Sequence, residues 1–286
     1  MRLGVTRNPF ESNAPAALIA AARHLPVDVR VIDLATVRAE IGSDGGAGAF
    51  DRDGPIEVDA VTPFLLYGFP AAAHAYRVIT RRAITQNSVD AILTADDKAT
   101  TADLLATAKV PQVPTHVVPP DLAEVLAAAD RLGYPVVLKR THGAQGRWVR
   151  RAADGAALAA AFDQLTPEGP GAMVIQPEVV ECRGRSIRVV VTGGRPLVAA
   201  ERVATGDEWR SNINQGASQH PTDITDEELG LVTRSIEALG LGHAGVDILR
   251  TADGPRILEV NACPDFTSMQ PHADRDLARE IILASL

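Results

Sequence analysis

Residues 245–261, GVDILRTADGPRILEVN, constrain the fold more than any other part of this chain. Two strand-like, β-branched runs flank a short turn, and Gly254 suits the left-handed position of a three-residue hairpin loop. With such a loop Asp247 pairs directly with Glu259, and their Cβ atoms are expected roughly 4.5–5.5 Å apart. Asn261 points to the same face because side chains alternate along a strand. The segment therefore predicts a hairpin that gathers two carboxylates and an amide on one face.

This gathering of oxygen atoms indicates a metal site. Like charges placed directly opposite each other destabilise a sheet, so a positive group is expected between Asp247 and Glu259. Hard oxygen ligands on a rigid hairpin suit Mg²⁺, which usually keeps water and phosphate oxygens in its shell. The spacing alone also allows a solvent-facing hairpin that merely carries acidic residues.

The first hundred residues alternate short β-branched runs with alanine-rich stretches, which is typical of βα units around a mostly parallel sheet. We expect a helix over Pro15–Leu25 and an exposed, glycine-rich loop over Gly42–Gly54. The strands expected here are Leu3–Thr6, Val27–Ile32, Phe64–Tyr67 and Val89–Leu93.

The rest of the chain mixes helices and strands. Helices are expected over Lys98–Ala108 and Leu122–Leu132, and a third opens at Thr225 and ends at Gly240. The proline-rich segment 110–120 should be extended. The strands expected here are Val136–Lys139, Arg147–Arg151, Val174–Gln176, Ser186–Thr192, Pro196–Arg202, Val246–Arg250 and Arg256–Val260. The fold class is therefore α/β, with an α+β C-terminal part, divided at 1–95, 96–172 and 173–286.

Composition excludes several classes of protein. A net charge of −8 argues against a basic nucleic-acid groove, and no apolar run approaches the ~20 residues of a membrane span. The N-terminus lacks the pattern of a secretory signal. Cys182 and Cys263 form no CxxC motif and suit reduced thiols. We therefore expect a cytoplasmic protein that binds neither nucleic acid nor membrane.

Basic residues upstream of the hairpin complement its carboxylates. Lys139 ends a β-branched strand and precedes the glycine-containing loop 141–146, whose N–H groups suit phosphates. Lys98 stands at a helix start, where a cation is unfavourable unless an anion is near. Arg188, Arg202 and Arg210 are spread over the strands that lead to the hairpin. This combination is typical of a site for a Mg-bound polyphosphate.

Seven segments in this order resemble ATP-grasp ligases, and more narrowly the RimK-type glutamate ligases and the related LysX-type ligases of amino-group-carrier biosynthesis. They are DDK at 96–98, PVVLK at 135–139, THGAQG at 141–146, IQPEV at 175–179, RSN at 210–212, AGVDILR at 244–250 and LEVNACP at 258–264. The resemblance covers about residues 90–272. The first 90 residues match only as a short preATP-grasp βα domain.

The resemblance implies an ATP-grasp fold and a ligase that joins a carboxylate to an amine. In such families ATP phosphorylates the carboxylate, the amine attacks the acyl phosphate, and ADP and phosphate leave. The implied cofactors are ATP and Mg²⁺ or Mn²⁺. The implied substrates are an amino acid such as glutamate and a peptide, carrier protein or small molecule. A homo-oligomer would be usual.

The resemblance also assigns roles to individual residues. Asp247, Glu259 and Asn261 would hold the metal, and Lys98, Lys139 and the loop at Gly146 would contact phosphates. Arg210 with Asn212 would address the transferred phosphoryl group and the acceptor carboxylate, and Arg202 would also neutralise developing charge. The remaining nucleotide contacts implied are Gln176, Pro177, Glu178, Val179, Ser186 and Ser211, with Glu178 or Glu181 meeting the ribose.

Two departures from the family pattern bear on substrates. Ser186 stands where RimK-like chains usually carry an acidic residue, and CPDFTSM follows the metal strand in place of their usual endings. Two other functions remain open at this point. One is a nucleotide-binding module without ligase chemistry. The other is a metal-dependent phosphohydrolase, although the sequence offers no obvious general base for it.

Overall fold

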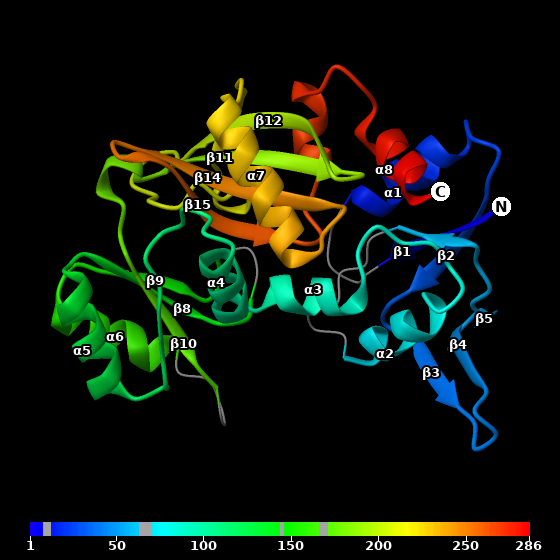
Figure 1. Ribbon diagram of the computed structural model, residues 1–286, viewed down its shortest axis with the longest axis horizontal. Helices are drawn as coiled ribbons and strands as arrows, with labels where there is room; N and C mark the ends of the chain where they lie inside the picture. Colours follow the sequence, from blue (N-terminus) through cyan, green and yellow to red (C-terminus); the bar gives the residue numbers. More distant parts are fainter. Residues whose placement is uncertain (8–12, 63–69, 144–145, 166–170) are drawn as a thin grey trace.

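Two antiparallel sheets lie one above the other at one end of the molecule, and a parallel sheet formed by the N-terminal region lies at the other end (Figure 1). The computed structural model describes residues 1–7, 13–62, 70–143, 146–165 and 171–286. In the described residues the β2-β1-β6 sheet is parallel and the other sheets are antiparallel. This bears out the expected α/β class with an α+β C-terminal part. Among the described residues, every helix is too short or too polar to cross a bilayer.

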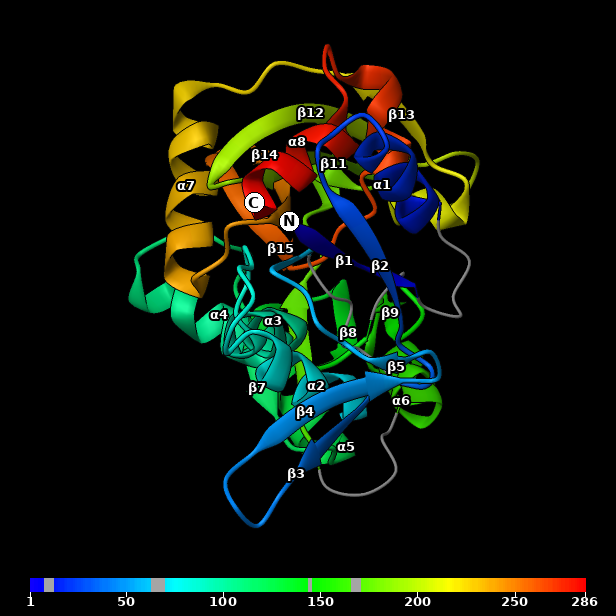
Figure 2. The ribbon, with the colours of Figure 1, turned by 90° about the vertical axis from the view of Figure 1, so that its right-hand side faces the viewer.

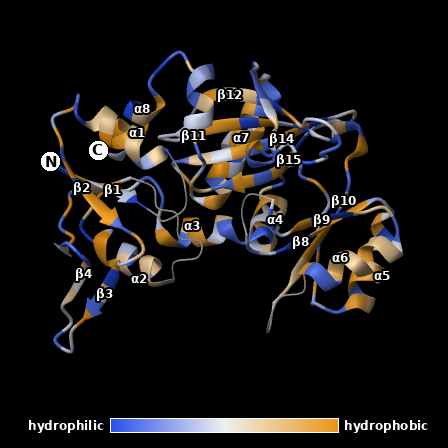
Figure 3. Cartoon of the chain, turned by 180° about the vertical axis from the view of Figure 1, so that it is seen from behind, coloured by the Kyte–Doolittle hydropathy of each residue, from blue (hydrophilic) through white to orange (hydrophobic). Residues whose placement is uncertain are grey.

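The larger antiparallel sheet has five strands in the order β13-β12-β11-β14-β15. Its strands are β11 (Arg185–Thr192), β12 (Arg195–Val203), β13 (Ser218–Pro221), β14 (Ala244–Thr251) and β15 (Gly254–Asn261). Val189 and Val190 are fully buried in different clusters, as expected of neighbours on a strand that is covered on both faces. Figure 3 shows hydrophobic residues along the strands of this sheet.

Helices cover both faces of the five-stranded sheet. On one face lie α3 (Val89–Asp96), α4 (Lys98–Thr107) and α7 (Asp226–Leu239). On the other lie α1 (Ala14–Ala22), the 3₁₀ helix η3 (Thr267–His272) and α8 (Leu277–Ser285). The remaining 3₁₀ turns are η1 (Val180–Cys182) and η2 (Ile213–Gln215). Segments far apart in sequence thus build one core around the central strands.

The hairpin of β14 and β15 has the predicted pairing of Asp247 with Glu259 but reaches it differently. Thr251 pairs with Gly254, so the loop has two residues where three were expected. A bulge at Leu258 then shifts the register by one residue and restores the expected pairing. Such a bulge bends the strand and re-aims its side chains. The three-residue loop was therefore a wrong expectation, whereas the carboxylate pair was right.

The smaller antiparallel sheet has four strands in the order β7-β10-β8-β9. They are β7 (His116–Val118), β8 (Val136–Arg140), β9 (Val149–Ala152) and β10 (Met173–Pro177), with α5 (Leu122–Leu132) and α6 (Gly155–Leu165) packed against them. Asp121 caps α5 by accepting from the amides of Ala123 and Glu124. The expected boundary at 172/173 falls directly before β10, which belongs to this sheet. The division into 1–95, 96–172 and 173–286 stays a proposal.

The N-terminal parallel sheet has the order β2-β1-β6, with β1 (Arg2–Arg7), β2 (Asp28–Asp33) and β6 (Ala60–Val61). A second sheet, β3 (Arg38–Ile41), β4 (Ala47–Asp51) and β5 (Gly54–Pro55), projects away from the rest of the molecule (Figure 2). The expected loop over Gly42–Gly54 was therefore largely wrong. The segment forms part of a meander, in which Gly45, with φ 84°, lies in the turn between β3 and β4, whereas Gly48 lies within β4.

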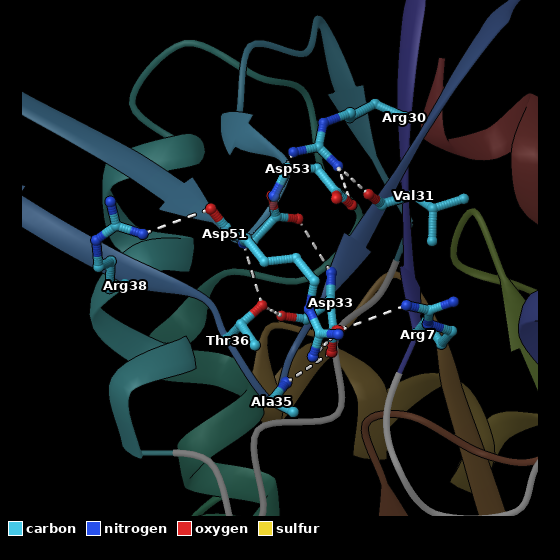
Figure 4. A network of polar contacts seen from close by, with 10 residues as sticks. Arg7, Arg30, Val31, Asp33, Ala35, Thr36, Arg38, Asp51 and Asp53 are labelled. Carbon is cyan, nitrogen blue, oxygen red and sulfur yellow. Dashed lines mark hydrogen bonds and ion pairs between the residues drawn. The ribbon is translucent and has the colours of Figure 1, made fainter.

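A buried aspartate joins these two N-terminal sheets (Figure 4). Asp51 accepts hydrogen bonds from Arg30 at 2.5 Å and from the Asp33 amide at 3.2 Å. Burial opposes ionisation of Asp51, but the Arg30 hydrogen bond holds its pKa below the usual value. Asp33 in turn lies 3.4 Å from the Arg7 guanidinium and 3.0 Å from that of Arg52. The meander is thus anchored to the ends of β1 and β2.

Several element boundaries differ from expectation for local reasons. The expected strand Val89–Leu93 was wrong: it belongs to α3, whose N-cap Ser88 accepts from the Ala91 amide. The helix expected over Lys98–Ala108 is α4, and Asp97 caps it by accepting from the amides of Ala99 and Thr100. The Thr225 capping box and the Gly240 C-cap of α7 are confirmed. The expected strand Phe64–Tyr67 lies outside the described residues, next to α2 (Pro70–Ile79).

Candidate functional site

A cleft lies between the four-stranded and five-stranded sheets. Both sheets contribute to its lining, and so does the N-terminus of α4. It brings together most of the predicted site residues: Lys98, Lys139, Gly146, Gln176, Pro177, Glu178, Val179, Arg210, Ser211, Asn212 and Glu259. Residues from five separate stretches of sequence thus share one cavity, as in many small-molecule sites.

Two lysines supply positive charge beside the carboxylates. The Lys98 Nζ donates to the Gly143 carbonyl at 2.7 Å and lies 3.9 Å from the Glu259 carboxylate. Lys139, on β8, is largely enclosed, and this burial together with the charge of Lys98 lowers its pKa to about 8, against the opposing influence of Glu259. Lysines held near carboxylates in this way can bind an anion without a net accumulation of charge.

Asp247 is buried and held by an arginine that the sequence analysis gave no specific role. Arg188, on the neighbouring strand β11, donates from Nε to Oδ1 at 2.5 Å and from Nη2 to Oδ2 at 2.6 Å. Arg202 lies 3.8 Å from the same carboxylate. Burial, and the nearby charge of Arg188, lower the pKa of Arg202 to about 10. Two guanidinium groups therefore share one buried carboxylate, which leaves positive charge for an anionic ligand.

Four predicted site residues lie beside the cleft and not in its lining: Ser186, Arg202, Asp247 and Asn261. Asp247 adjoins the cleft through its strand partner Glu259, which does line it. The Asn261 Nδ2 lies 3.5 Å from the Gly245 carbonyl, at the outer limit of a hydrogen bond. Ser186 is buried, and its hydroxyl lies 2.6 Å from that of Ser211. Ser186 thus packs behind the RSN segment.

The segment 176–179 forms the wall where β10 ends, but the Glu178 side chain is engaged elsewhere. Its carboxylate accepts from Arg151 Nε at 2.7 Å and from Arg183 Nε at 2.6 Å. Burial opposes ionisation, but these hydrogen bonds keep the pKa of Glu178 below its usual value. Its amide donates to the Pro135 carbonyl at 2.9 Å. The Glu178 side chain therefore stabilises this wall through its arginine partners. The Glu181 carboxylate accepts from the Ala252 amide at 3.4 Å.

Arg210 lies in the cleft and holds the glycine loop. Its guanidinium makes two hydrogen bonds of 2.9 Å with Glu208 and one of 3.0 Å with the Gly146 carbonyl. The hydrogen bonds from Arg210 lower the pKa of Glu208 to about 2. A Cβ added at Gly146, where φ is 68°, would come within 3.2 Å of Asn212 Oδ1. Residues 144–145 of this loop lie outside the described residues.

An apolar patch in the cleft was missed by sequence reasoning. Val113, Cys182 and Leu249 form a small buried cluster against Val179 and Leu258. All five line the cleft that the two lysines also line. Leu258 lines the cleft next to Glu259 because it is the bulged residue of β15. The alternation of a regular strand would have placed these two side chains on opposite faces, so no sequence signal indicated this patch.

Comparisons with known proteins agree with this geometry. The RimK-like ATP-grasp domain matches residues 95–285, and the chain therefore belongs to the RimK-like ATP-grasp family. This family comprises ATP-dependent carboxylate–amine ligases. The fold agrees as well. A RimK-domain ATP-grasp protein from Sphaerobacter thermophilus DSM 20745 superimposes with a TM-score of 0.74 over 100% of both chains at 20% identity.

Two curated relatives are similar over part of the chain. A stretch of 199 residues, 68% of this chain and 67% of the relative, is 33% identical to the tetrahydromethanopterin:alpha-L-glutamate ligase of Methanococcus maripaludis. Another of 146 residues, 51% of this chain, is 37% identical to a probable alpha-L-glutamate ligase of Parasynechococcus marenigrum. The match spans only 31% of that second relative's length.

Proposed function

We propose that this chain is an ATP-dependent ligase that joins a carboxylate to an amine through an acyl phosphate. The observation that carries the proposal is the cleft itself, whose lining combines Lys98, Lys139 and Glu259 with an apolar patch. Charged side chains for phosphates and apolar side chains for a base in one cavity suit ATP. The family to which the chain belongs supports the same reading.

Mg²⁺, or Mn²⁺ in its place, fits the side chains at the hairpin. A carboxylate offers about four lone-pair positions, and Arg188 occupies only one on each oxygen of Asp247. With Nδ2 of Asn261 turned towards the Gly245 carbonyl, its Oδ1 is left as a ligand. Asp247, Glu259 and Asn261 would hold the ion, which when bound offsets phosphate charge and orients the transferred group.

The chain's own residues would bind and orient the reactants. Lys98 and Lys139 would neutralise phosphate oxygens, and the 176–179 wall would hold the adenine. Arg210 with Ser211 and Asn212 would grip the transferred phosphoryl group, with Arg202 offsetting charge from behind Asp247. The substrate carboxylate attacks the terminal phosphorus and ADP leaves. The amine nitrogen then attacks the acyl carbon, loses a proton, and releases phosphate.

Glutamate is the amino acid that we propose as one substrate, on the strength of the two relatives named as glutamate ligases. The partner would be a peptide, a carrier protein or a small molecule. Surplus positive charge at Arg188 and Arg202 suits a substrate that carries a carboxylate. We further propose that the protein is cytoplasmic and forms a homo-oligomer. Light scattering on the purified protein would test the oligomeric state.

The experiment is a screen of carboxylate and amine pairs for ATP-dependent phosphate release, with products identified by mass. We expect ADP, phosphate and a condensation product in equal amounts, formed only when both substrates and Mg²⁺ are present. Glu259→Gln serves as the inactive control. Phosphate release that needs no amine would instead identify a phosphohydrolase. Nucleotide binding without turnover on any pair would identify a binding module.

A further inference from the structure

Asn87 lies in the link between α2 and α3, and its side chain has all of its hydrogen-bonding positions filled. The residue is 0% exposed. Its Nδ2 donates to the carbonyls of His243 at 2.8 Å and Ala262 at 2.9 Å. Its Oδ1 accepts from the amides of Gly242 and His243, both at 2.9 Å. One amide therefore ties together two backbone segments that are distant in sequence.

These two segments are the open end of the hairpin formed by β14 and β15. His243 directly precedes β14, which carries Asp247. Ala262 directly follows Asn261, the last residue of β15. The turn after Thr251 closes the opposite end of the hairpin. Backbone pairing joins the two strands from Thr251–Gly254 to Gly245–Asn261, and the Asn87 side chain continues this link beyond the last pair, to residues 242–243 and Ala262.

Asn87 is itself held in place by the N-terminal region. Its carbonyl accepts from the Tyr76 hydroxyl at 3.0 Å and from the Thr85 hydroxyl at 3.2 Å. Tyr76 is 0% exposed and belongs to α2. The Asn87 backbone is therefore hydrogen-bonded to a buried side chain of α2, so a displacement of Asn87 would require α2 to move as well.

Only a carboxamide of this size satisfies the four backbone groups. Two carbonyls need donors and two amides need an acceptor, and a neutral amide offers both at once. An aspartate would place an oxygen against the His243 and Ala262 carbonyls. An alanine would remove the Asn87 partner of the His243 amide and of the His243 and Ala262 carbonyls, at a cost comparable to lost hydrogen bonds, whereas the Gly242 amide keeps the Gln86 carbonyl at 3.2 Å.

We propose that Asn87 is a positioning residue for the metal site: by linking residues 242–243 to Ala262 just beyond the last ladder pair, it holds in place the end of the hairpin that presents Asp247 and Asn261. The inference rests on the proposed assignment of Mg²⁺ to this hairpin. Residues that orient metal ligands from behind typically change metal affinity by about 10–100-fold when they are replaced.

Gln86 provides a matched control because it directly precedes Asn87 and binds other parts of the C-terminal region, without touching the hairpin ends through its side chain. Its Nε2 donates to the Ile281 carbonyl at 3.1 Å and to the Ser285 hydroxyl at 3.0 Å. Its Oε1 accepts from the Gly193 amide at 2.9 Å. Loss of this side chain weakens the contact of the N-terminal region with α8 and the β11–β12 turn.

The test is Mn²⁺ binding followed by electron paramagnetic resonance, in the presence of a non-hydrolysable ATP analogue. We expect Asn87→Ala to weaken Mn²⁺ binding by at least ~10-fold and to alter the spectrum of the bound ion. Gln86→Ala should bind Mn²⁺ within about twofold of wild type, even where thermal unfolding shows a similar loss of stability. Equal Mn²⁺ affinity in wild type and Asn87→Ala, or an equal loss in both variants, would overturn the proposal.

Two further measurements keep the proposal testable. If Asn87→Ala does not fold, hydrogen exchange on the wild-type protein replaces it. Mn²⁺ with the analogue should then slow exchange of the Gly242 and His243 amides, which donate to Asn87, and unchanged exchange would contradict the proposal. If wild type itself binds no Mn²⁺ with the analogue present, the metal assignment is wrong and the role of Asn87 falls with it.

Discussion

Arg188 grips the Asp247 carboxylate with two parallel hydrogen bonds, of 2.5 Å and 2.6 Å, across neighbouring strands of the five-stranded sheet. Both side chains are only 9% exposed. A Cβ at Gly245 would lie 2.7 Å from Arg188 Nη1, so the absence of a side chain there makes room for the guanidinium. Asp247 is therefore oriented before any ligand binds, and its charge is balanced by a partner that cannot lose its proton.

The first prediction separates the two carboxylates of the hairpin. Asp247→Asn removes the charge that compensates buried Arg188, so the free energy of unfolding should fall by about 3 kcal/mol. Glu259→Gln should have little effect on stability, since the Glu259 side chain is 33% exposed. Both variants should lose metal-dependent turnover. Urea unfolding and Mn²⁺ titration of the two proteins provide the measurements.

The difference in unfolding free energy between Asp247→Asn and Glu259→Gln decides this prediction. Sequence alone predicts little loss of stability for either substitution, because each changes the volume only slightly. Equal unfolding free energies for the two variants would mean that the Arg188–Asp247 pair contributes nothing measurable. Wild-type turnover by either variant at saturating Mg²⁺ and ATP would show that the metal assignment is wrong.

The second prediction concerns Arg210, which the structure ties to Glu208 and to the Gly146 carbonyl. Arg210→Lys should bind ATP within a few-fold of wild type, because Lys98 and Lys139, the proposed phosphate contacts, are unchanged. Turnover should fall by at least ~10²-fold, since an ammonium group cannot reproduce the planar double contact of a guanidinium. Calorimetry for nucleotide affinity and single-turnover rates separate the two effects.

Glu208→Gln is the control for this prediction. It keeps an acceptor for Arg210 but removes its charged partner, so a purely structural role for the pair predicts similar losses in both variants. A role in the transition state predicts turnover within about threefold of wild type for Glu208→Gln. A near-normal rate for Arg210→Lys would place Arg210 outside the catalytic set.

Sequence patterns predict this molecule well where one local rule decides the outcome. The capping box at Thr225 and the left-handed glycine at Gly240 fix both ends of α7. The pairing of Asp247 with Glu259 was also correct, although the shorter loop and the bulge at Leu258 offset each other. With the two-residue loop and no bulge, Asp247 would pair with Leu258, so period-two alternation alone does not place Glu259 beside it.

Patterns fail where distant contacts decide. The run Val89–Leu93 suits a strand or a helix equally, and the cap at Ser88 with packing against α7 selects the helix. The glycine-rich segment 42–54 becomes a meander because buried Asp51 finds partners on β2. Arg188 and Asn87 are ordinary polar residues in the sequence. Their roles exist only through contacts made across the folded chain.

The third prediction follows from the lowered pKa of Lys139, about 8. Above that pH the folded protein holds Lys139 neutral, so its attraction for phosphate disappears. Affinity for an ATP analogue should therefore decrease as pH rises from 7 to 9, whereas Lys139→Arg should bind with little pH dependence because arginine stays charged. Calorimetric titrations at several pH values measure this.

The contribution of Lys139 to the stability of the fold should change with pH in the opposite direction to its contribution to nucleotide affinity. Between pH 8 and the ordinary lysine pKa of 10.5, the unfolded chain binds a proton at Lys139 that the folded chain does not. The contribution of Lys139 to the free energy of unfolding should hence rise with pH in this window. Nucleotide affinity that stays constant from pH 7 to 9 in wild type would argue that Lys139 does not contact the phosphates.

The last prediction uses His243, the residue whose backbone Asn87 holds at the start of β14. Burial lowers the pKa of His243 from 6.5 to about 4, and its Nδ1 lies 2.8 Å from the Thr192 hydroxyl. Because the unfolded chain takes up a proton at His243 that the folded chain refuses, stability is lost as pH falls from 6.5 towards 4. The loss from this residue should reach about 3 kcal/mol. His243→Gln has no charge to acquire, so its unfolding free energy should fall less steeply over this range. Urea unfolding of both proteins at pH 7, 6, 5 and 4 gives the comparison, and parallel curves would show that the imidazole is not kept neutral by the fold.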